Sequence, residues 1–169
     1  MILSRIKSLI PGFNQDPIDI KIDFPNRQYR LDELVDLSIN LVPKSNLYVV
    51  QGTADLVCTE HFVETYTRMV EVLPQKGWIS RGTPSPIAVI PTQEIKEFEE
   101  VSIHNSVVFL ENTTLRTRVK REYYPKLKVQ LGKSPHSDLA STTWVVSIKI
   151  DIKDGIQVNQ NKQISISIK

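Results

Sequence analysis

Apolar and polar residues alternate with a period of two along most of the chain. Residues 18–24 read Ile-Asp-Ile-Lys-Ile-Asp-Phe, and residues 33–42 and 163–169 repeat this alternation. Side chains of a β-strand point alternately to its two faces, so each stretch is typical of a strand with one buried face. In the second stretch, the predicted core face consists of Val35, Leu37, Ile39 and Leu41.

The strongest alternation lies in residues 141–152. Its apolar positions are Trp144, Val146, Ile148, Ile150 and Ile152, and they alternate with Ser147, Lys149 and Asp151. This pattern predicts a strand whose tryptophan faces the core. A register shift of one residue would reverse every face along it.

The remaining stretches predict an all-β fold. Residues 47–68 read as one long or bulged strand with a bend at Gly52, and residues 104–110, 114–124 and 126–131 read as further strands. Turns separate these strands, and helical periodicity is nearly absent. The pattern favours an antiparallel, immunoglobulin-like β-sandwich over a parallel α/β sheet.

Two segments interrupt the strand pattern. Residues 74–92 are rich in proline and glycine and predict an extended loop, with a possible edge strand at residues 87–90. The acidic residues 93–100 read as a short helix or as a solvated strand entry. Strands on both sides are needed for one core, so residues 13–169 are predicted to form a single domain.

The second interruption is a short amphipathic segment at residues 1–12. Its apolar residues recur at helical spacing, with Arg5 and Lys7 on the opposite side, until Pro11-Gly12 ends the run. It is expected to pack on its own sandwich or to form an edge strand. The alternatives are a dimerisation element and a weak anchor at a membrane surface.

Composition narrows the range of partners and compartments. The formal net charge is +2 and 24% of residues are charged, so bulk charge does not favour nucleic acid as a partner. A single cysteine, Cys58, excludes an intramolecular disulfide and fits a reducing compartment. No apolar run reaches the roughly 20 residues of a membrane span. The sequence therefore predicts a cytoplasmic protein.

The order of the predicted strands resembles that of the arrestin-like β-sandwich, including its bacterial and archaeal sporulation-control relatives. Tyr29 precedes an acidic turn, Asp32-Glu33, that leads into the second strand, and the strand from Trp144 to Ile152 leads into the last strand of the domain. The resemblance covers most of residues 18–168. It implies a single arrestin-like sandwich in this chain.

The sequence contains no recognisable catalytic or metal-binding motif. His61, His104 and His136 are far apart, and neither a phosphate-binding loop nor a nucleophile elbow occurs. Cys58 and His61 are three positions apart, which places them on opposite faces of a strand rather than together as nucleophile and base. We therefore expect a non-enzymatic protein with no catalytic residues, metal or cofactor.

Basic residues form the main candidate binding surface. Arg116, Arg118 and Lys120 are predicted to share one strand face, and Lys126 and Lys128 continue the pattern in the next strand. Such a surface would suit a phosphorylated peptide, an anionic lipid or an acidic protein. The alternative is a solvated face that protects the sheet edge.

Trp78 lies in the loop at residues 74–92 and is a second candidate contact. It would be exposed for a partner or tucked back as a plug.

The preferred hypothesis is a cytoplasmic adaptor or scaffold. It would bind a protein partner, or a second copy of itself, through a sheet edge, loops or the basic face. The alternative is a small-ligand or carbohydrate-binding sandwich, possibly hydrolytic, with a pocket near Trp78 and Tyr123. A third hypothesis is peripheral membrane attachment through residues 1–12.

Overall fold

The computed structural model describes residues 16–72, 88–132 and 141–167, and its regular structure is entirely β. The ten strands are β1 (Ile18–Asp23), β2 (Gln28–Arg30), β3 (Leu34–Asp36), β4 (Ser38–Pro43), β5 (Leu47–Val72), β6 (Ala88–Leu115), β7 (Arg121–Tyr123), β8 (Lys126–Lys128), β9 (Ser141–Ile152) and β10 (Ile156–Ser167). Within these ranges, no helix has the length and apolar character needed to cross a membrane.

Contacts divide the chain into two compact units. The sandwich unit holds Met1–Thr59, Val101–Ser134 and Thr142–Lys169, and the ribbon unit holds Glu60–Glu100 and Pro135–Ser141. Strands β5 and β6 each contribute residues to both units. The N-terminal segment 1–12 and most of the loop at residues 74–92 lie outside the described residues, and the extent of the predicted domain, residues 13–169, stays a prediction.

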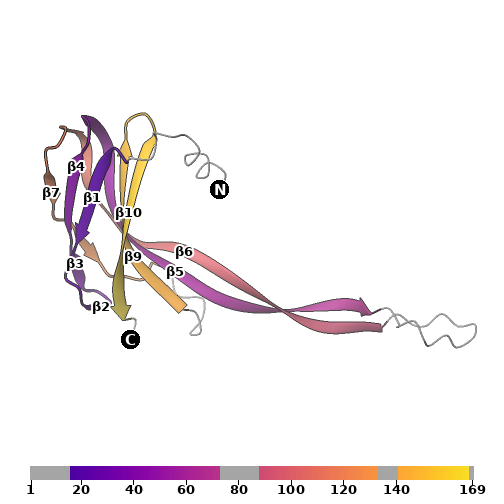
Figure 1. The fold of residues 1–169 in the computed structure, drawn as a ribbon. Coiled ribbons are helices and arrows are strands. Elements are labelled where there is room, and N and C mark those ends of the chain that lie inside the picture. The colour runs from indigo at the N-terminus through magenta and orange to yellow at the C-terminus, as the bar shows by residue number, and fades with distance from the viewer. Residues whose placement is uncertain (1–15, 73–87, 133–140, 168–169) are drawn as a thin grey trace, which may run out of the picture. The chain divides into compact units, whose positions relative to one another are not determined.

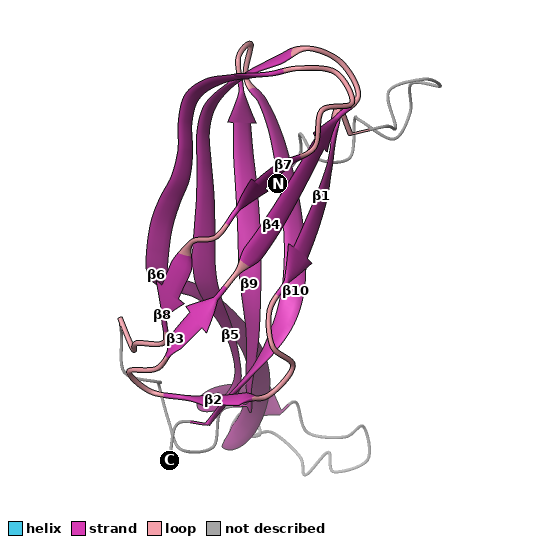
Figure 2. Cartoon of the chain, turned by 90° about the vertical axis from the view of Figure 1, so that its left-hand side faces the viewer, coloured by secondary structure: helices cyan, strands magenta, loops and turns pink. Residues whose placement is uncertain are grey.

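Three sheets build the sandwich unit. A three-stranded sheet has the order β1-β4-β7, a five-stranded sheet has the order β2-β10-β9-β5-β6, and β3 pairs with β8 (Figure 1). Figure 2 looks onto the three-stranded sheet, with strands of the five-stranded sheet behind it. The β1–β4, β4–β7, β3–β8 and β9–β10 pairs are antiparallel, whereas β2 pairs with β10 in parallel. The predicted all-β sandwich is confirmed.

The core lies between the sheets and follows the predicted alternation. Val35, Leu37, Ile39 and Leu41 are buried, as expected for residues 33–42. The predicted single strand is divided at Leu37 into β3, which pairs with β8, and β4, which pairs with β1 and β7; between them, the N–H of Leu37 donates to the carbonyl of Pro125 at 3.0 Å. The faces of the two strands were therefore predicted correctly even though their boundary was not.

Trp144 belongs to this core. It is only 4% exposed, and the alternate positions Val146, Ile148, Ile150 and Ile152 are buried with it. Along β10, each residue from Ile156 to Ile164 pairs with a residue of β9. The predicted register of residues 141–152 is confirmed.

The long strand β5 contains Gly52, which is buried. A Cβ atom added there would lie 3.1 Å from both the Leu110 Cβ and the Phe109 Cζ, and 3.2 Å from the Ile150 Cδ1. These neighbours belong to β6 and β9, the two strands beside β5 in the sheet. A glycine is needed here because the two adjacent strands bring side chains against the backbone of β5.

Two expectations need correction. The loop predicted for residues 74–92 ends early, because β6 begins at Ala88, within the edge strand allowed for at residues 87–90, and continues through Pro91. Of the two alternatives given for residues 93–100, the structure shows the strand.

The second correction concerns residues 114–124, which do not form one strand. Strand β6 ends at Leu115, and Arg116–Lys120 connect it to β7, which pairs with β4 in the other sheet. Arg118 has a φ of 59°, and its N–H donates to the carbonyl of Pro43 at 2.8 Å. The shared strand face predicted for Arg116, Arg118 and Lys120 is therefore wrong.

Candidate functional site

The basic residues singled out in the sequence belong to different elements of the sandwich unit. Arg116, Arg118 and Lys120 lie in the β6–β7 connection, whereas Lys126 and Lys128 lie in β8, which pairs with β3. All five side chains are exposed. The other candidate, Trp78, lies outside the described residues. The binding roles of all six residues stay predictions.

The three lysines have carboxylate partners. Lys128 Nζ lies 2.9 Å from Asp32 Oδ1, Lys126 Nζ lies 3.3 Å from Asp36 Oδ1, and Lys120 forms an ion pair with Glu122. Exposed pairs of this kind contribute little stability, but they balance the lysine charge locally. The unbalanced positive charge of this region therefore comes from arginine.

Three arginines lie in this connection and at the first residue of β7. Arg116, Arg118 and Arg121 are exposed, and no ion pair joins them to any described residue. Val119, 43% exposed, lies among them in the sequence, and Tyr124, 67% exposed, follows. We call Arg116–Arg121 the arginine turn.

Hydrogen bonds hold the arginine turn in place. Asn46 Oδ1 accepts from the backbone N–H of Thr117 at 2.9 Å and from its hydroxyl at 3.0 Å. Beyond the turn, Glu122 accepts hydrogen bonds from Lys120 and Tyr124, which lower the pKa of its carboxyl group. The Tyr124 hydroxyl, bonded to that carboxylate, has its pKa raised in turn.

The outer edge of β6 is a second candidate surface, which sequence reasoning missed. Strand β6 is the last strand of the five-stranded sheet. Gly52 lies beside Phe109 and Leu110, and the Ser106 hydroxyl donates to Asp55 at 2.6 Å, so residue numbers rise along β5 as they fall along β6. The two strands are therefore antiparallel.

Backbone groups on this edge point away from β5 at alternate residues. The carbonyl of His104 accepts from Gln130 Nε2 at 3.2 Å, and the N–H of Ser106 donates to Asn105 Oδ1 at 2.8 Å. In an antiparallel strand, the N–H and C=O of one residue point to the same side and alternate along the chain. The backbone groups of Val108 and Leu110 are therefore expected to face outward as well.

A shallow groove lies on this part of β6. It has a volume of about 320 Å³ and is lined by four successive residues, Val108–Glu111. Val108 is 44% exposed, and the Phe109 ring packs against Tyr123 with 5.3 Å between centroids. The one signal in the sequence was the run of four apolar residues at 107–110, which leaves no polar face to the strand.

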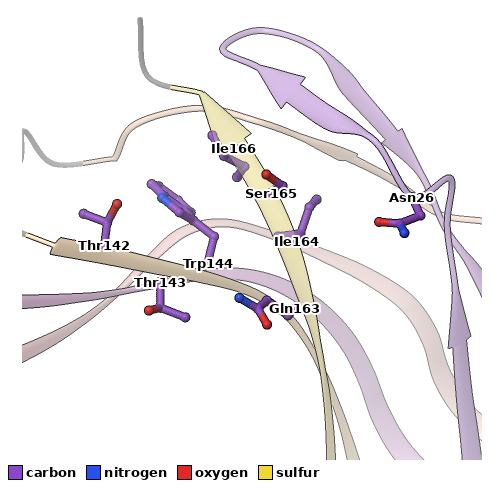
Figure 3. Close-up of a pocket in the computed structure, with 8 residues that line it drawn as sticks. All are labelled: Asn26, Thr142, Thr143, Trp144, Gln163, Ile164, Ser165 and Ile166. Atoms are coloured by element: carbon purple, nitrogen blue, oxygen red, sulfur yellow. The ribbon is translucent and has the colours of Figure 1, made fainter.

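A cavity of about 330 Å³ lies beside Trp144 where β9 and β10 separate (Figure 3). The two strands pair as far as Trp144 and Ile164, and β10 then continues alongside β2. The lining side chains are Asn26, Thr142, Thr143, Trp144, Gln163, Ile164, Ser165 and Ile166. Among the described residues, the buried indole Nε1 of Trp144 has no hydrogen-bond partner. The described side chains of this lining include no ionisable group.

His104 is a structural residue. Its Nδ1 accepts from the N–H of Gly132 at 2.8 Å, its Nε2 lies 2.8 Å from Ser102 Oγ, and its ring lies 4.8 Å from that of Trp144. The acceptor at Nδ1 places the ring proton on Nε2, which describes a neutral imidazole. Across the described parts of the chain, no three His, Cys, Asp or Glu side chains are grouped so as to hold a metal ion.

Tyr29, one of the residues that carries the arrestin-like resemblance, is also structural. It is buried, and its hydroxyl donates to the carbonyl of Pro25 at 2.9 Å. The Arg27 guanidinium lies 4.1 Å from the centre of the Tyr29 ring and 2.6 Å from Glu33 Oε2. Burial raises the pKa of the Tyr29 hydroxyl. The acidic turn and the tyrosine are thus tied together through one arginine.

Comparison with known proteins identifies the fold. No family model and no curated protein sequence matches the chain. Among solved structures, the sporulation control protein Spo0M of Bacillus subtilis is similar, with a TM-score of 0.61 over 92% of this chain. The fold is arrestin-like. Sequence identity to Spo0M is 11%, and the alignment spans 51% of that chain, about half its length.

Proposed function

We propose that this chain is a non-catalytic adaptor that binds an extended segment of a partner protein as an added strand on the outer edge of β6. The proposal rests on the groove lined by Val108–Glu111 and on the Ser106 N–H, which donates to Asn105 Oδ1; from the alternation of the strand, the backbone groups of Val108 are expected to face outward in the same way. An added strand would bond to the N–H and C=O groups of this edge and place alternate side chains in the groove.

The composition of the edge supports this assignment. Free edges of natural sheets are commonly protected by charged residues, proline or bulges. Residues 106–110, Ser-Val-Val-Phe-Leu, contain neither charge nor proline. The accessible stretch ends at Asn112, whose φ of 44° interrupts the extended backbone. It is therefore long enough for a short peptide strand and bounded at one end.

The fold also agrees with a regulatory role. Spo0M, which shares the arrestin-like fold, is described as a sporulation control protein. The partner we propose is a protein segment in extended conformation.

Selection from a random peptide library tests the proposal. The affinity of each selected peptide is measured by calorimetry for the wild type and for two variants. Val108→Pro removes the N–H at this position, and Val108→Ala keeps it. Proline is tolerated at an edge position whose N–H faces outward. Because the loss of a main-chain hydrogen bond costs about 1 kcal/mol, we expect roughly fivefold to tenfold weaker binding for the proline variant.

The alanine variant separates backbone pairing from side-chain contact. If both variants lose binding equally, the Val108 side chain and not strand addition explains it. Amide hydrogen exchange supplies a second measurement, since a bound strand should slow the exchange of the Val108 and Leu110 amides. Peptides that bind the wild type without this protection would contradict the proposal.

A further inference from the structure

The ribbon unit contains a two-stranded ribbon made of residues 60–72 of β5 and 88–100 of β6. Phe62 and Phe98 stack across it with ring centroids 5.6 Å apart, and Tyr66 lies 6.2 Å from Phe98. On the opposite face, His61 Nδ1 lies 4.0 Å from Glu99 Oε2. Because side chains alternate along a strand, even-numbered residues share the aromatic face and odd-numbered residues share the other.

The odd-numbered face is apolar and unusually exposed. Met69 and Ile95 are 66% and 68% exposed, and Val63 is 59% exposed. An isolated two-stranded ribbon is at best marginally stable in water, and exposed apolar patches mark interaction sites. This face is therefore a candidate surface for a partner.

The same face is acidic. Its charged side chains are Glu71, Glu97 and Glu99, and the imidazole Nδ1 of His61 lies 4.0 Å from Glu99 Oε2. The even-numbered face differs, because Arg68 and Lys96 offset two of its four glutamates, Glu60, Glu64, Glu94 and Glu100, whereas the odd-numbered face of these residues has no Lys or Arg. We call the odd-numbered surface, with Val63, Met69, Ile95, Glu71, Glu97 and Glu99, the acidic face. A matching surface would be basic with an apolar centre.

Charge is divided between the two units in a way that supplies such a surface. The ribbon unit carries four Lys or Arg and eight Asp or Glu, a net charge of −4, while the sandwich unit carries 17 and 11, a net charge of +6. In the sandwich unit, the arginine turn contains three arginines that form no ion pair with any described residue. The exposed side chain of Val119 lies between them in the sequence. This combination complements the acidic face in both charge and polarity.

We propose that the acidic face of one copy docks on the arginine turn of a second copy. Val63, Met69 and Ile95 would cover Val119, and the guanidinium groups would pair with the glutamates around it, in contacts that carboxylate and guanidinium geometry favours. The contact joins two different surfaces. Two copies form a closed dimer if each places its acidic face on the arginine turn of the other, and longer assemblies form if they do not. It uses neither Val108 nor the β6 groove, and is independent of the proposed function.

Charge reversal with exchange of partners tests the contact. The turn variant is R116E/R118E/R121E, and the ribbon variant is E71R/E97R/E99R. Masses are measured by sedimentation of the full chain in low salt over a wide concentration range. We expect the wild type to exceed its monomer mass of 19.3 kDa, and each variant to associate at least tenfold more weakly, because like charges would then face each other.

Mixing the two variants is the decisive arm. The unchanged acidic face of the turn variant meets the unchanged arginine turn of the ribbon variant, and the two reversed surfaces also match, so the mixture should recover the wild-type mass. Circular dichroism controls for folding, which these exposed positions should leave unchanged. Any of three results would overturn the proposal that a second copy binds here. They are a wild type that stays monomeric, variants that associate like the wild type, and a mixture of the two variants that stays monomeric.

A matched pair of single substitutions assigns the face. Glu94 and Glu97 lie on the same strand and are both exposed, but they belong to opposite faces. Glu97→Arg should weaken association severalfold, whereas Glu94→Arg, with the same change in net charge, should leave it unchanged. Equal effects of the two would show a general charge effect rather than docking, and would overturn the proposal.

Discussion

At the scale of single residues, Gly52 shows how closely the sheet is packed. A Cβ added to it would lie 3.1–3.2 Å from atoms of Leu110, Phe109 and Ile150, so these neighbours would have to move by a few tenths of an ångström. We expect Gly52→Val to lower the free energy of unfolding by about 1–3 kcal/mol, because the added carbons force neighbouring strands apart. Urea denaturation measures the change.

Gly155 provides the comparison for this substitution. It has a φ of 78° and nothing lies within 4 Å of an added Cβ. Gly155→Ala should therefore cost only about 1 kcal/mol, which reflects backbone conformation alone. A Gly52→Val protein as stable as the wild type would show that β5 and β6 can move apart freely.

A second residue-scale prediction concerns Glu33. Its pKa is lowered chiefly by the hydrogen bond from Arg27, and further by that from the backbone of Arg30. A carboxyl group with a lowered folded-state pKa stabilises the fold above its unfolded-state pKa, and that contribution is lost as pH falls through the folded value. We expect Arg27→Gln to raise the pKa of Glu33 toward its usual range, measured by NMR titration. An unchanged pKa would show that Arg27 is not the cause.

At the scale of elements, the connection between β6 and β7 depends on one amide side chain. Asn46 Oδ1 accepts both hydrogen bonds from Thr117. Asn46→Ala should destabilise the protein by about 1–2 kcal/mol in thermal or urea unfolding, because two hydrogen bonds are lost. Asn46→Asp keeps the acceptor oxygen and should fall close to the wild type. Equal losses for the two would assign another role to the side chain.

This connection also shows what the sequence could and could not predict. Alternation identified most of the strands and placed Trp144 and Leu41 in the core, because burial imposes the period of two directly. The pattern failed at residues 116–120. Charged residues alternate there with Thr117 and Val119, as they would in a strand, although the backbone turns. The turn depends on Asn46 and Pro43, which are distant in sequence.

The candidate surfaces were harder to predict for the same reason. The basic residues were identifiable by type. The carboxylates that balance Lys126 and Lys128 lie in and near β3, and the pairing of β3 with β8 brings them beside the lysines. The open edge of β6 depends on strand order, which a pattern of faces does not contain. Alternation indicates which side of a strand is buried, and not which strand lies beside it.

At the scale of the whole molecule, the division into two units predicts that the sandwich folds without the ribbon. Residues 59 and 101 lie on the neighbouring strands β5 and β6, so residues 60–100 can be replaced by an Asn-Gly hairpin turn. The buried core lies in the retained residues. We expect cooperative thermal unfolding within several degrees of the wild type, followed by circular dichroism. A chain that fails to fold would show that the ribbon supports the core.

The parallel pairing of β2 with β10 has a consequence for synthesis. Gln28–Arg30 leave the ribosome long before their partners, Ser165–Ser167, because the two segments are far apart in the sequence. Contacts between such distant segments slow folding, because the intervening chain must be ordered first. Strand β2 therefore cannot join the five-stranded sheet until residues 165–167 have left the ribosome.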